Sequence, residues 1–433
     1  MEQIVPEAPD FEELLDRDNH KIRSIEATFE LTSPLFMAGG GNEENDAAEL
    51  RPTGIKGALR FWWRALNWPR ISNPDNVEAL DEAQALVQLH QEECALFGAA
   101  HKKDTDRGAA VFSLQLLPVR KGFTLFNFAG KNNEGLQYLM GQGLQNQGTL
   151  LRKGYAAGGR FSIRIEANAQ MSDAQWMSLN DALHAFSLLG GLGSRARKGL
   201  GSVALVAVQG DASFSVPDTR QAYIVSLKSL LATASNVRKL PPYTALSSFT
   251  RLDISLEARS PTLLENIGIT QNEFRSFRKP KTRHVCVEQD HNMVLDAATT
   301  PSDKTAPPCQ PARTVFGLPH NYYFSKQKPK LTVDFNVRLA DASGTPSEAR
   351  RASPLFIHIH KVGNDYLAVQ FLMPAVFLPD SASLHLKSVQ DRKERARHRF
   401  EFGASKINWA LLHDYLNTFV KRKVIIEAIR GCV

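Results

Sequence analysis

The chain has 433 residues, of which 43% are hydrophobic, so it is long enough for two to three domains with real cores. Lys and Arg number 52 against 45 Asp and Glu, and the formal net charge of +7 makes a polyanionic partner plausible. We expect no signal peptide, no membrane-spanning segment and a reduced, cytoplasmic setting, because the N-terminus is acidic, no apolar run is long enough and the cysteines form no C-x-x-C pair.

The first half of the chain alternates predicted strands and helices. Strands are expected where apolar and polar residues alternate, and helices where apolar residues recur every three or four positions. Six elements follow in the order strand, helix, strand, strand, helix, strand: residues 25–31, from 53 onward, 111–119, 161–167, from 172 onward and 202–208. This order is typical of ferredoxin-like (RRM-like) domains, whose antiparallel sheet carries both helices on one face and leaves the other face free for a ligand.

Other segments of this half complete a first domain at residues 21–210, after an N-terminal extension at 1–20. Residues 122–155, rich in Gly, Asn and Gln, are expected to form an inserted hairpin or loop. A further helix is expected at 77–97. Its predicted core positions are Leu80, Ala83, Val87, Cys94 and Phe97.

The second half, residues 211–433, is expected to be a second and more decorated ferredoxin-like domain. Helices are predicted at 221–233, 263–278 and 407–421, and strands at 252–258, 331–339, 355–360 and 367–372. The proline-rich segment 296–312 is expected to be a loop without regular structure. The predicted fold class is therefore α+β, with two tandem ferredoxin-like domains.

A glycine-rich loop at 190–201 carries Arg195, Arg197 and Lys198 between a helix capped by Ser172 and a strand. Dinucleotide and P-loop fingerprints are excluded, because they need a strand before the glycines and a helix after them. Two interpretations remain. The loop is either a helix C-cap with solvated charges or a phosphate-binding loop in which glycines let backbone amides approach a ligand.

Three more basic segments are candidates for binding a polyanion. Lys56, Arg60 and Arg64 form a stripe beside Trp63, which is expected at an exposed edge; cations beside an aromatic ring suit single-stranded nucleic acid, although a solvated helix face also explains them. Arg350 and Arg351 precede a predicted strand. The run at 392–399 is expected to be a solvated helix or mobile arm: Arg392, Lys393, Arg395, Arg397 and Arg399.

Catalytic and metal-binding residues are not assigned. The connection after the first strand contains no histidine, and its acidic residues, Asp46 above all, are explained by a polar surface loop more simply than by a role at a 2′-hydroxyl or a metal. His358 and His360 share one side of a strand, but no third ligand is evident and packing is the preferred explanation. No cofactor is expected.

Several motifs taken together resemble a known family. Besides the glycine loop at 190–201, they are Pro34-Leu-Phe-Met-Ala-Gly-Gly40, Glu49-Leu-Arg51-Pro52, Ile55-Lys-Gly-Ala-Leu-Arg-Phe-Trp-Trp-Arg64 and Arg350-Arg-Ala-Ser-Pro-Leu355. In these segments the chain resembles the RAMP superfamily of CRISPR-associated proteins, and within it the first RAMP-module subunit of type III-B effector complexes.

The resemblance implies an RNA-binding structural subunit at one end of an RNA-guided interference complex in antiviral defence. Its partners would be the guide RNA toward the 3′ end, the target RNA and other RAMP subunits, with no membrane and no catalysis of its own. The alternative is a metal-independent RAMP-type endoribonuclease that processes CRISPR repeat RNA. The expected RNA-binding residues are Arg51, Lys56, Arg60, Trp63, Arg64, Gly191, Gly193, Ser194, Arg195, Arg197, Lys198, Arg350 and Arg351.

Overall fold

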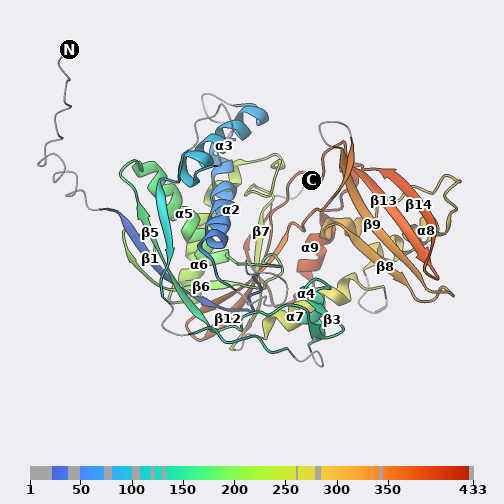
Figure 1. Ribbon diagram of the computed structural model, residues 1–433, viewed down its shortest axis with the longest axis horizontal. Helices are drawn as coiled ribbons and strands as arrows, with labels where there is room; N and C mark the ends of the chain where they lie inside the picture. The colour runs from blue at the N-terminus through green and yellow to red at the C-terminus, as the bar shows by residue number, and fades with distance from the viewer. Residues whose placement is uncertain are drawn as a thin grey trace, which may run out of the picture.

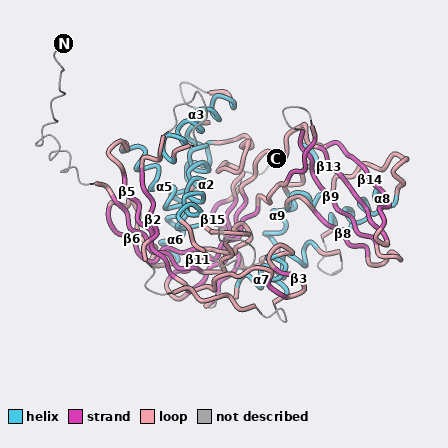
Figure 2. Tube along the Cα trace, viewed as in Figure 1, coloured by secondary structure: helices cyan, strands magenta, loops and turns pink. Residues whose placement is uncertain are grey.

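The protein is described by a computed structural model. The described residues are 22–37, 49–72, 80–99, 108–118, 122–128, 133–259, 262–277, 284–340 and 345–428. The fold is mixed α and β with antiparallel sheets. Figure 2 shows several helices close together in the left part of the molecule and a part made largely of strands at the right.

The first sheet has the spatial order β2-β5-β1-β6, with all neighbours antiparallel. Its strands are β1 (Ser24–Leu31), β2 (Phe112–Leu116), β5 (Arg160–Ala167) and β6 (Val203–Gly210). Helix α2 (Pro52–Ile71) follows β1 and helix α5 (Asp173–Leu189) follows β5, so the element order predicted from the sequence is observed. Apolar pairs such as Phe29 and Phe161 face the helices and form the core.

Helix α3 (Glu82–Phe97) is present, but its buried face differs from the prediction. Leu80 and Val87 are exposed and Cys94 is half-buried, whereas Ala85 and Leu89 are buried. A capping box between Asp81 and Gln84 fixes where the helix begins, and packing against α2 selects the buried face. Val77, the first residue of the predicted helix, lies outside the described residues.

A second sheet, in the second half, has the order β11-β12-β7-β15. Its strands are β7 (Arg251–Ala258), β11 (Leu355–Val362), β12 (Asp365–Leu372) and β15 (Lys423–Ile426), and its helices are α7 (Leu263–Arg275) after β7 and α9 (Ala410–Asn417) after β12. When the four strands of each sheet are numbered in chain order, both sheets have the same spatial order: second, third, first, fourth. Strand β15 has no counterpart among the strands predicted from the sequence.

A third sheet is built from segments inserted into the second half and lies at the right of Figure 1. It comprises β8 (His320–Phe324), β9 (Leu331–Ala340), β10 (Pro346–Ala349), β13 (Ser383–Gln390) and β14 (Lys393–Glu401), and α8 (Val285–Thr299) packs on β13 and β14. The prediction of a solvated helix or arm at 392–399 is wrong, because this run forms β14 and the turn before it. Residues 296–299 belong to α8, so the predicted loop begins only at 300.

The insertion at 122–155 joins the two halves. It contains helix α4 (Glu134–Met140) and a short hairpin of β3 (Gln145–Asn146) and β4 (Thr149–Leu150). Glu265 of α7 accepts hydrogen bonds from the backbone N–H groups of Gly135 and Leu136, both at 2.8 Å, and so satisfies the N-terminus of α4. Helices α4 and α7 cross where Gly135 meets Gly268. A Cβ added to either glycine would lie only 2.0 Å from the other helix, so the close crossing depends on the absence of side chains there.

The remaining described helices are short. They are α6 (Arg220–Leu230) and the 3₁₀ turns η2 (Ala232–Asn236), η3 (Ala312–Phe316) and η4 (Ala404–Lys406). None of the helices in the described part of the chain is both long and apolar enough to cross a membrane.

Candidate nucleic-acid interface

The glycine-rich loop folds back on itself after helix α5. Gly191 pairs with Ser202, and the Leu192 N–H donates to the Gly201 carbonyl at 2.9 Å. Gly193 has φ 75°, and a Cβ there would lie 2.3 Å from the carbonyl oxygen of Phe36. The Ser194 N–H donates to that same carbonyl at 2.7 Å. These residues therefore pack the loop against the segment that follows β1, and RNA contact by Gly191, Gly193 and Ser194 stays a prediction.

The same loop is attached to β11 in the second half of the chain. The Ile357 N–H donates to the Arg197 carbonyl at 3.0 Å, and Lys198 forms an isolated parallel bridge with Ile357. The Arg197 guanidinium donates through Nη1 to the Ser353 carbonyl at 3.3 Å. Arg350 and Arg351, which immediately precede β11, are thereby brought beside the loop.

Arg197 is held by aromatic rings. Its guanidinium carbon lies 4.6 Å from the ring centre of Phe356 and 5.7 Å from that of Phe61. Such stacking suits arginine, because a planar and weakly hydrated guanidinium loses less on leaving water than an ammonium does. Phe61 belongs to α2, so segments from three distant parts of the sequence meet at this side chain.

The cations of the loop and of the 350–351 segment affect one another. Burial, and then the charge of Arg350, lower the pKa of Arg195, while burial and then the charge of Arg351 lower the pKa of Arg197 to about 10. Burial also lowers the pKa of Arg351, which donates to the Val376 carbonyl at 2.8 Å. Among the described residues none of these four arginines has an ion pair with a carboxylate. We call Arg195, Arg197, Arg350 and Arg351 the arginine cluster.

The basic stripe on α2 faces α3 instead. The Arg60 guanidinium donates to the Gly98 carbonyl at 2.8 Å and pairs with Glu93 at 3.3 Å, and Arg64 pairs with the same carboxylate at 3.8 Å. Lys56 lies over the ring of Phe112 at 5.3 Å, and burial followed by the charge of Arg60 lowers its pKa. The structure thus places these three predicted RNA-binding side chains in contacts within the protein.

Two further predicted residues of this segment have contacts of other kinds. Arg51 is the N-cap residue of α2 by position, without a capping hydrogen bond from its side chain. Its Nε lies 3.7 Å from the Glu49 carboxylate. Trp63 is 2% exposed and packs edge-on against Phe97, with ring centres 6.2 Å apart. The prediction of Trp63 as an exposed base-stacking residue is wrong, because its position on α2 faces α3 and the core.

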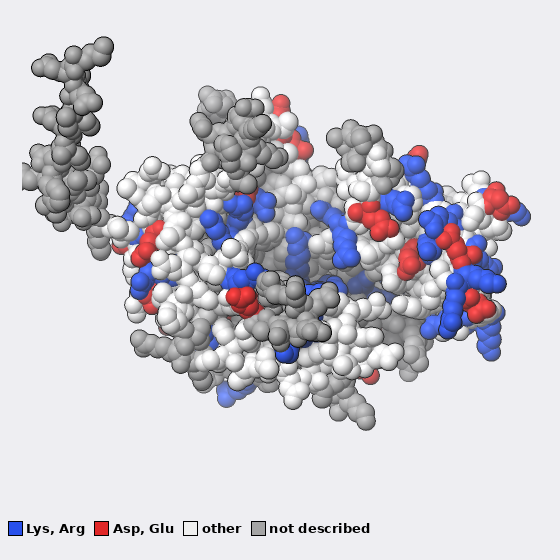
Figure 3. All heavy atoms as spheres, viewed as in Figure 1, with Lys and Arg blue, Asp and Glu red and all other residues white. Residues whose placement is uncertain are grey.

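In the basic run at 392–399 one acidic residue, Glu394, pairs with Arg397 at 2.8 Å and with the neighbouring Lys387 at 3.7 Å. Arg395 donates to the Gln390 side chain. Figure 3 shows this mixture of blue and red on the part of the molecule that holds β13 and β14, whereas blue atoms gather with few red ones in the recessed middle of the same face.

Sequence reasoning missed several polar residues beside the loop. Lys198 Nζ lies 3.3 Å from Gln271 Oε1 of α7, and Arg275 of the same helix donates to Tyr138 of α4 at 2.7 Å and to His320 of β8. Arg275 sits at the end of a correctly predicted helix. No local signal separates it from a solvated arginine, since its partners are distant in sequence.

The two histidines of β11 lie in the core. His358 and His360 are 1% and 2% exposed, with Nε2 and Nδ1 3.3 Å apart, and His360 stacks on Tyr223. Among the described residues there is no group of three or more His, Cys, Asp or Glu side chains that could hold a metal ion. Asp46 lies outside the described residues.

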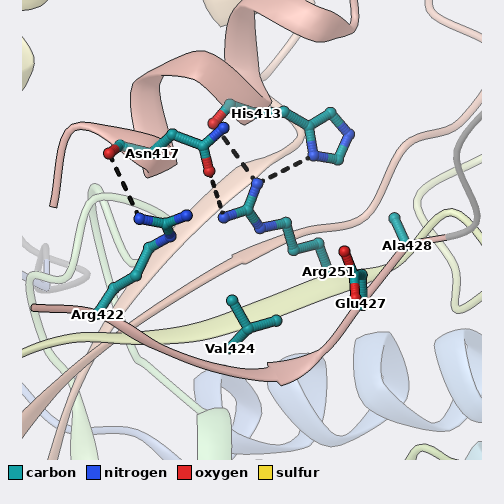
Figure 4. A pocket seen from close by; sticks show the side chains of 7 residues that line it. All are labelled: Arg251, His413, Asn417, Arg422, Val424, Glu427 and Ala428. Carbon is teal, nitrogen blue, oxygen red and sulfur yellow. Dashed lines mark hydrogen bonds between the residues drawn. The ribbon is translucent and has the colours of Figure 1, made fainter. Parts of the chain in front are cut away.

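A cavity of about 70 Å³ lies between β7 and the C-terminal part of the chain. Figure 4 shows Arg251 and Arg422 both directed toward Asn417 at its wall. Arg251 donates to Asp253 Oδ2 at 2.6 Å and to Asn417 at 2.9 Å. Its charge is therefore neutralised within the protein, and the arrangement is a structural support for α9.

Comparisons with known proteins agree with this architecture. Residues 28–204 match the model of the RAMP superfamily. The CRISPR system Cmr subunit Cmr1-1 of Pyrococcus furiosus is 22% identical over 353 residues, which cover 78% of this chain and 84% of that protein. The apo crystal structure of Cmr1 from Pyrococcus furiosus superimposes with a TM-score of 0.52 at 17% identity, covering 94% of this chain and 99% of that one.

A more distant match is the cryo-EM structure of the type III-B Cmr-beta complex bound to cognate target RNA and AMPPnP, with a TM-score of 0.45, 12% identity and coverage of 92% of this chain and 99% of that one. The resemblance stated from the sequence motifs is confirmed by the family match and by the similarity to Cmr1. Residues 28–204 of the chain match the RAMP superfamily model, and over most of its length the protein is similar in sequence and fold to Cmr1.

Proposed function

We propose that the protein is a non-catalytic, RNA-binding subunit of a type III-B CRISPR effector complex in the cytoplasm. The observation that carries the proposal is the arginine cluster, in which cations from two segments about 150 residues apart are held side by side without acidic partners among the described residues. Holding like charges together costs free energy in the isolated protein. A polyanion recovers that cost when it binds.

The surroundings of the cluster favour single-stranded RNA over other polyanions. Phe61 of α2 is half-buried and lies beside Arg197, so one aromatic ring occurs next to cations that suit phosphates, whereas Phe356 is buried and supports the Arg197 guanidinium from the core. The name of the Pyrococcus furiosus relative describes it as a Cmr subunit, which supports other RAMP subunits as partners. We infer that the RNA is the guide toward its 3′ side, the target, or both.

The repeated strand order supports the same assignment. We infer that both four-stranded sheets are ferredoxin-like units, the second carrying the third sheet as its decoration. The arginine cluster then lies at the junction of the two units, since Arg195 and Arg197 come from the first and Arg350 and Arg351 precede β11 of the second. A basic surface shared by two such units suits an extended RNA strand.

The double variant Arg195→Gln/Arg350→Gln tests the proposal by titration of single-stranded RNA at several salt concentrations. We expect roughly tenfold weaker binding at moderate salt and a slope of log affinity against log salt that is smaller by about 0.7 for each phosphate that is no longer neutralised. Lys393→Gln/Arg399→Gln is the matched control, because it also removes two positive charges, from exposed positions of β14 in the third sheet. Unchanged affinity and slope in the double variant would remove the arginine cluster from the RNA site.

The endoribonuclease alternative is separated by a second measurement. Incubation of the purified protein with labelled repeat RNA in the absence of metal is expected to leave the RNA intact. If the wild type cleaves the RNA at a specific site and a point substitution abolishes that cleavage, the protein is a nuclease and its assignment as a binding subunit is wrong. Co-purification with the other effector subunits and a guide RNA, read by mass spectrometry and RNA sequencing, tests the assembly directly.

A further inference from the structure

A second group of polar residues, two of them cations, lies where the glycine loop meets helix α7, which packs beside α4 (Figure 1). Its members are Lys198 of the loop, Gln271 and Arg275 of α7, Tyr138 of α4 and His320 of β8. The Lys198 ammonium lies 3.3 Å from Gln271 Oε1, and the Arg275 guanidinium donates to the Tyr138 hydroxyl at 2.7 Å and to His320 Nε2. We call this group the Lys198–Arg275 cluster.

The cluster has more positive charge and more hydrogen-bond donors than its neighbours can satisfy. No carboxylate among the described residues pairs with Lys198 or Arg275. Gln271 is fully buried and its Nε2 has no hydrogen-bond partner in the described part of the chain, and the same holds for the buried atoms Arg275 Nε and His320 Nδ1. Buried polar atoms in folded proteins nearly always have partners, so each of these needs an explanation.

A neighbouring arginine shows how the protein neutralises a buried cation when it needs only structure. Arg313 donates through Nε to Asp290 at 3.0 Å, and Asp290 also accepts from the backbone N–H groups of Ala312 and Arg313. Arg275 lies next to this pair, since Arg313 donates to its carbonyl at 2.9 Å. Lys198 and Arg275 have no such acid among the described residues, although the chain supplies one close by for Arg313.

We propose that the Lys198–Arg275 cluster is a binding subsite for a single phosphate group. An ammonium, a guanidinium and an amide N–H₂ from two elements are the donors that a phosphate accepts, and a dianion balances the two charges. A neutral ligand would leave the charge of Arg275 uncompensated and would give the Lys198 side chain no reason to take up a proton. That the phosphate belongs to RNA rests on the proposed function, whereas phosphate binding itself does not.

The subsite connects to the arginine cluster through Arg195. The Arg195 guanidinium lies against Gly141 at the C-terminus of α4, within 3.0 Å of where a Cβ would stand, and its charge acts on Lys198. An RNA strand bound by the arginine cluster can therefore place one of its phosphate groups against Lys198. The chemistry fits an internal phosphodiester or a terminal phosphate, and the experiment distinguishes them.

Proton uptake gives the subsite a measurable signature. Burial, then the charge of Arg275 from α7 and of Arg195 from the loop, lower the pKa of Lys198 to about 7; His320 faces Arg275 from β8 and is itself neutral, because burial holds its pKa well below the usual value. A phosphate beside Lys198 favours the charged ammonium and raises this pKa again. At pH 8 binding should therefore take up about one proton per site.

The test is isothermal titration calorimetry of the full-length protein with inorganic phosphate at pH 8, in two buffers of different ionisation enthalpy. We expect binding with proton uptake for the wild type, and at least tenfold weaker binding without uptake for Lys198→Met. Arg399→Gln is expected to behave as the wild type. Absence of binding to the wild type, or identical binding and proton uptake in Lys198→Met, would overturn the subsite.

Folding of the variant is checked by urea denaturation without phosphate. Lys198→Met should be at least as stable as the wild type, because it replaces a desolvated cation that has no acidic partner among the described residues with an apolar chain of similar length. Marked destabilisation would show that Lys198 is a structural residue and would also count against the subsite. Arg275→Gln provides an independent second variant with the same expected loss of phosphate affinity.

RNA titration separates failure of the subsite from failure of the proposed function. If Lys198→Met binds RNA with wild-type affinity while the arginine double variant does not, RNA binding by the arginine cluster is supported and the RNA-phosphate subsite at Lys198 is contradicted. If the wild type binds phosphate but no RNA, the function falls and the subsite stands. Oligonucleotides with a 3′-phosphate and with a 3′-hydroxyl distinguish terminal from internal phosphate, since only a terminal site prefers the former.

Discussion

Arg197 shows how a cation is kept ready at a surface without an acidic partner among the described residues. Its guanidinium lies over two neighbouring phenylalanine rings and its Nη1 donates to a backbone carbonyl, so it is positioned without being neutralised. Arg60 is the opposite case, because its guanidinium is paired with the Glu93 carboxylate and donates to a carbonyl at the C-terminus of α3. The two residues look alike in sequence, each being a basic residue near aromatic residues. Only their partners in the structure distinguish the two residues, and RNA binding by Arg197 stays a prediction.

Trp63 gives a prediction at the same scale. Trp63→Ala should lower the free energy of unfolding by about 3–5 kcal/mol, because it leaves a cavity against Phe97 in the core. Trp63→Phe should be far milder, since it keeps a ring and removes an indole N–H that has no partner among the described residues. Urea denaturation measures both changes. RNA affinity of the folded Trp63→Phe variant should stay within about twofold of the wild type, and a large loss at unchanged stability would restore Trp63 as a base-stacking residue.

At the scale of elements, the glycine loop is held by its own backbone and by both sheets. Gly199 has φ 82°, and a Cβ there would lie 2.5 Å from Leu264 and 2.9 Å from Ile357. The sequence predicts the glycines of this loop as places where a ligand approaches the backbone. In the structure they are first of all places where the protein approaches itself, and the arginines of the loop owe their positions to that packing.

A matched pair of substitutions tests this role. Gly199→Ala should destabilise the protein by roughly 1–3 kcal/mol, because alanine is strained at positive φ and its Cβ has no room. Gly57→Ala should stabilise it by about 0.5–1 kcal/mol, because Gly57 is an exposed residue inside α2 and an added Cβ would meet nothing within 4 Å among the described residues. Chemical denaturation should show opposite signs. A neutral Gly199→Ala variant would contradict the packing role.

Elements that the sequence does not reveal share a physical cause. Strand β14 buries Ala396 and His398 between exposed charged residues. The buried positions of this alternating pattern therefore hold one small and one polar side chain instead of large apolar ones. Hydrophobic periodicity cannot detect such a strand. Strand β13 buries Leu384 and Leu386 in alternation, a pattern that periodicity can detect, although β13 is not among the strands predicted from the sequence. The helix beginning at Ser172 is predictable, because its capping box is local.

At the scale of the whole molecule, the two halves repeat one strand order and share packing. The core cluster that contains β1 and α5 extends to Ile254, Phe356 and Phe371 of the second sheet. Lys361 of β11 pairs with Glu30 of β1, which also accepts from Arg160 at 2.7 Å. Burial alone would raise the pKa of Glu30, but the hydrogen bonds from Lys361 and Arg160 outweigh it and lower the pKa. The halves are therefore joined by apolar and by ionic contacts.

Buried histidines should make the whole fold sensitive to acid. Burial lowers the pKa of His358 to about 3 and that of His184 to about 4, while an unfolded histidine has a pKa near ~6.5. Below about pH 6.5 the unfolded chain therefore binds protons that the folded protein excludes, and stability falls with decreasing pH down to the folded values, by up to about 1.4 kcal/mol per pH unit for each histidine.

Denaturation at pH 7, 6 and 5 measures this slope. His358→Gln should reduce the slope by roughly 1 kcal/mol per pH unit averaged over this window, and by at most about 1.4 kcal/mol per pH unit at its acid end, because one neutral histidine is removed from the core. The window above about pH 5 keeps Glu30 out of the comparison, since its lowered pKa affects stability only at more acid values. His90→Gln, at an exposed position of α3, is the control. An unchanged slope in His358→Gln would contradict the assignment of a neutral buried histidine.

The sequence by itself determined the element order of the first half, the helix-to-strand context of the glycine loop and the motifs of the RAMP superfamily, because periodicity, caps and motifs are local. The tertiary structure alone decided which cations meet. Arg195 and Arg350 come together because β11 docks beside the glycine loop, and Lys198 meets Arg275 because α7 packs on α4. Such contacts depend on packing between segments far apart in the chain, which no local pattern encodes.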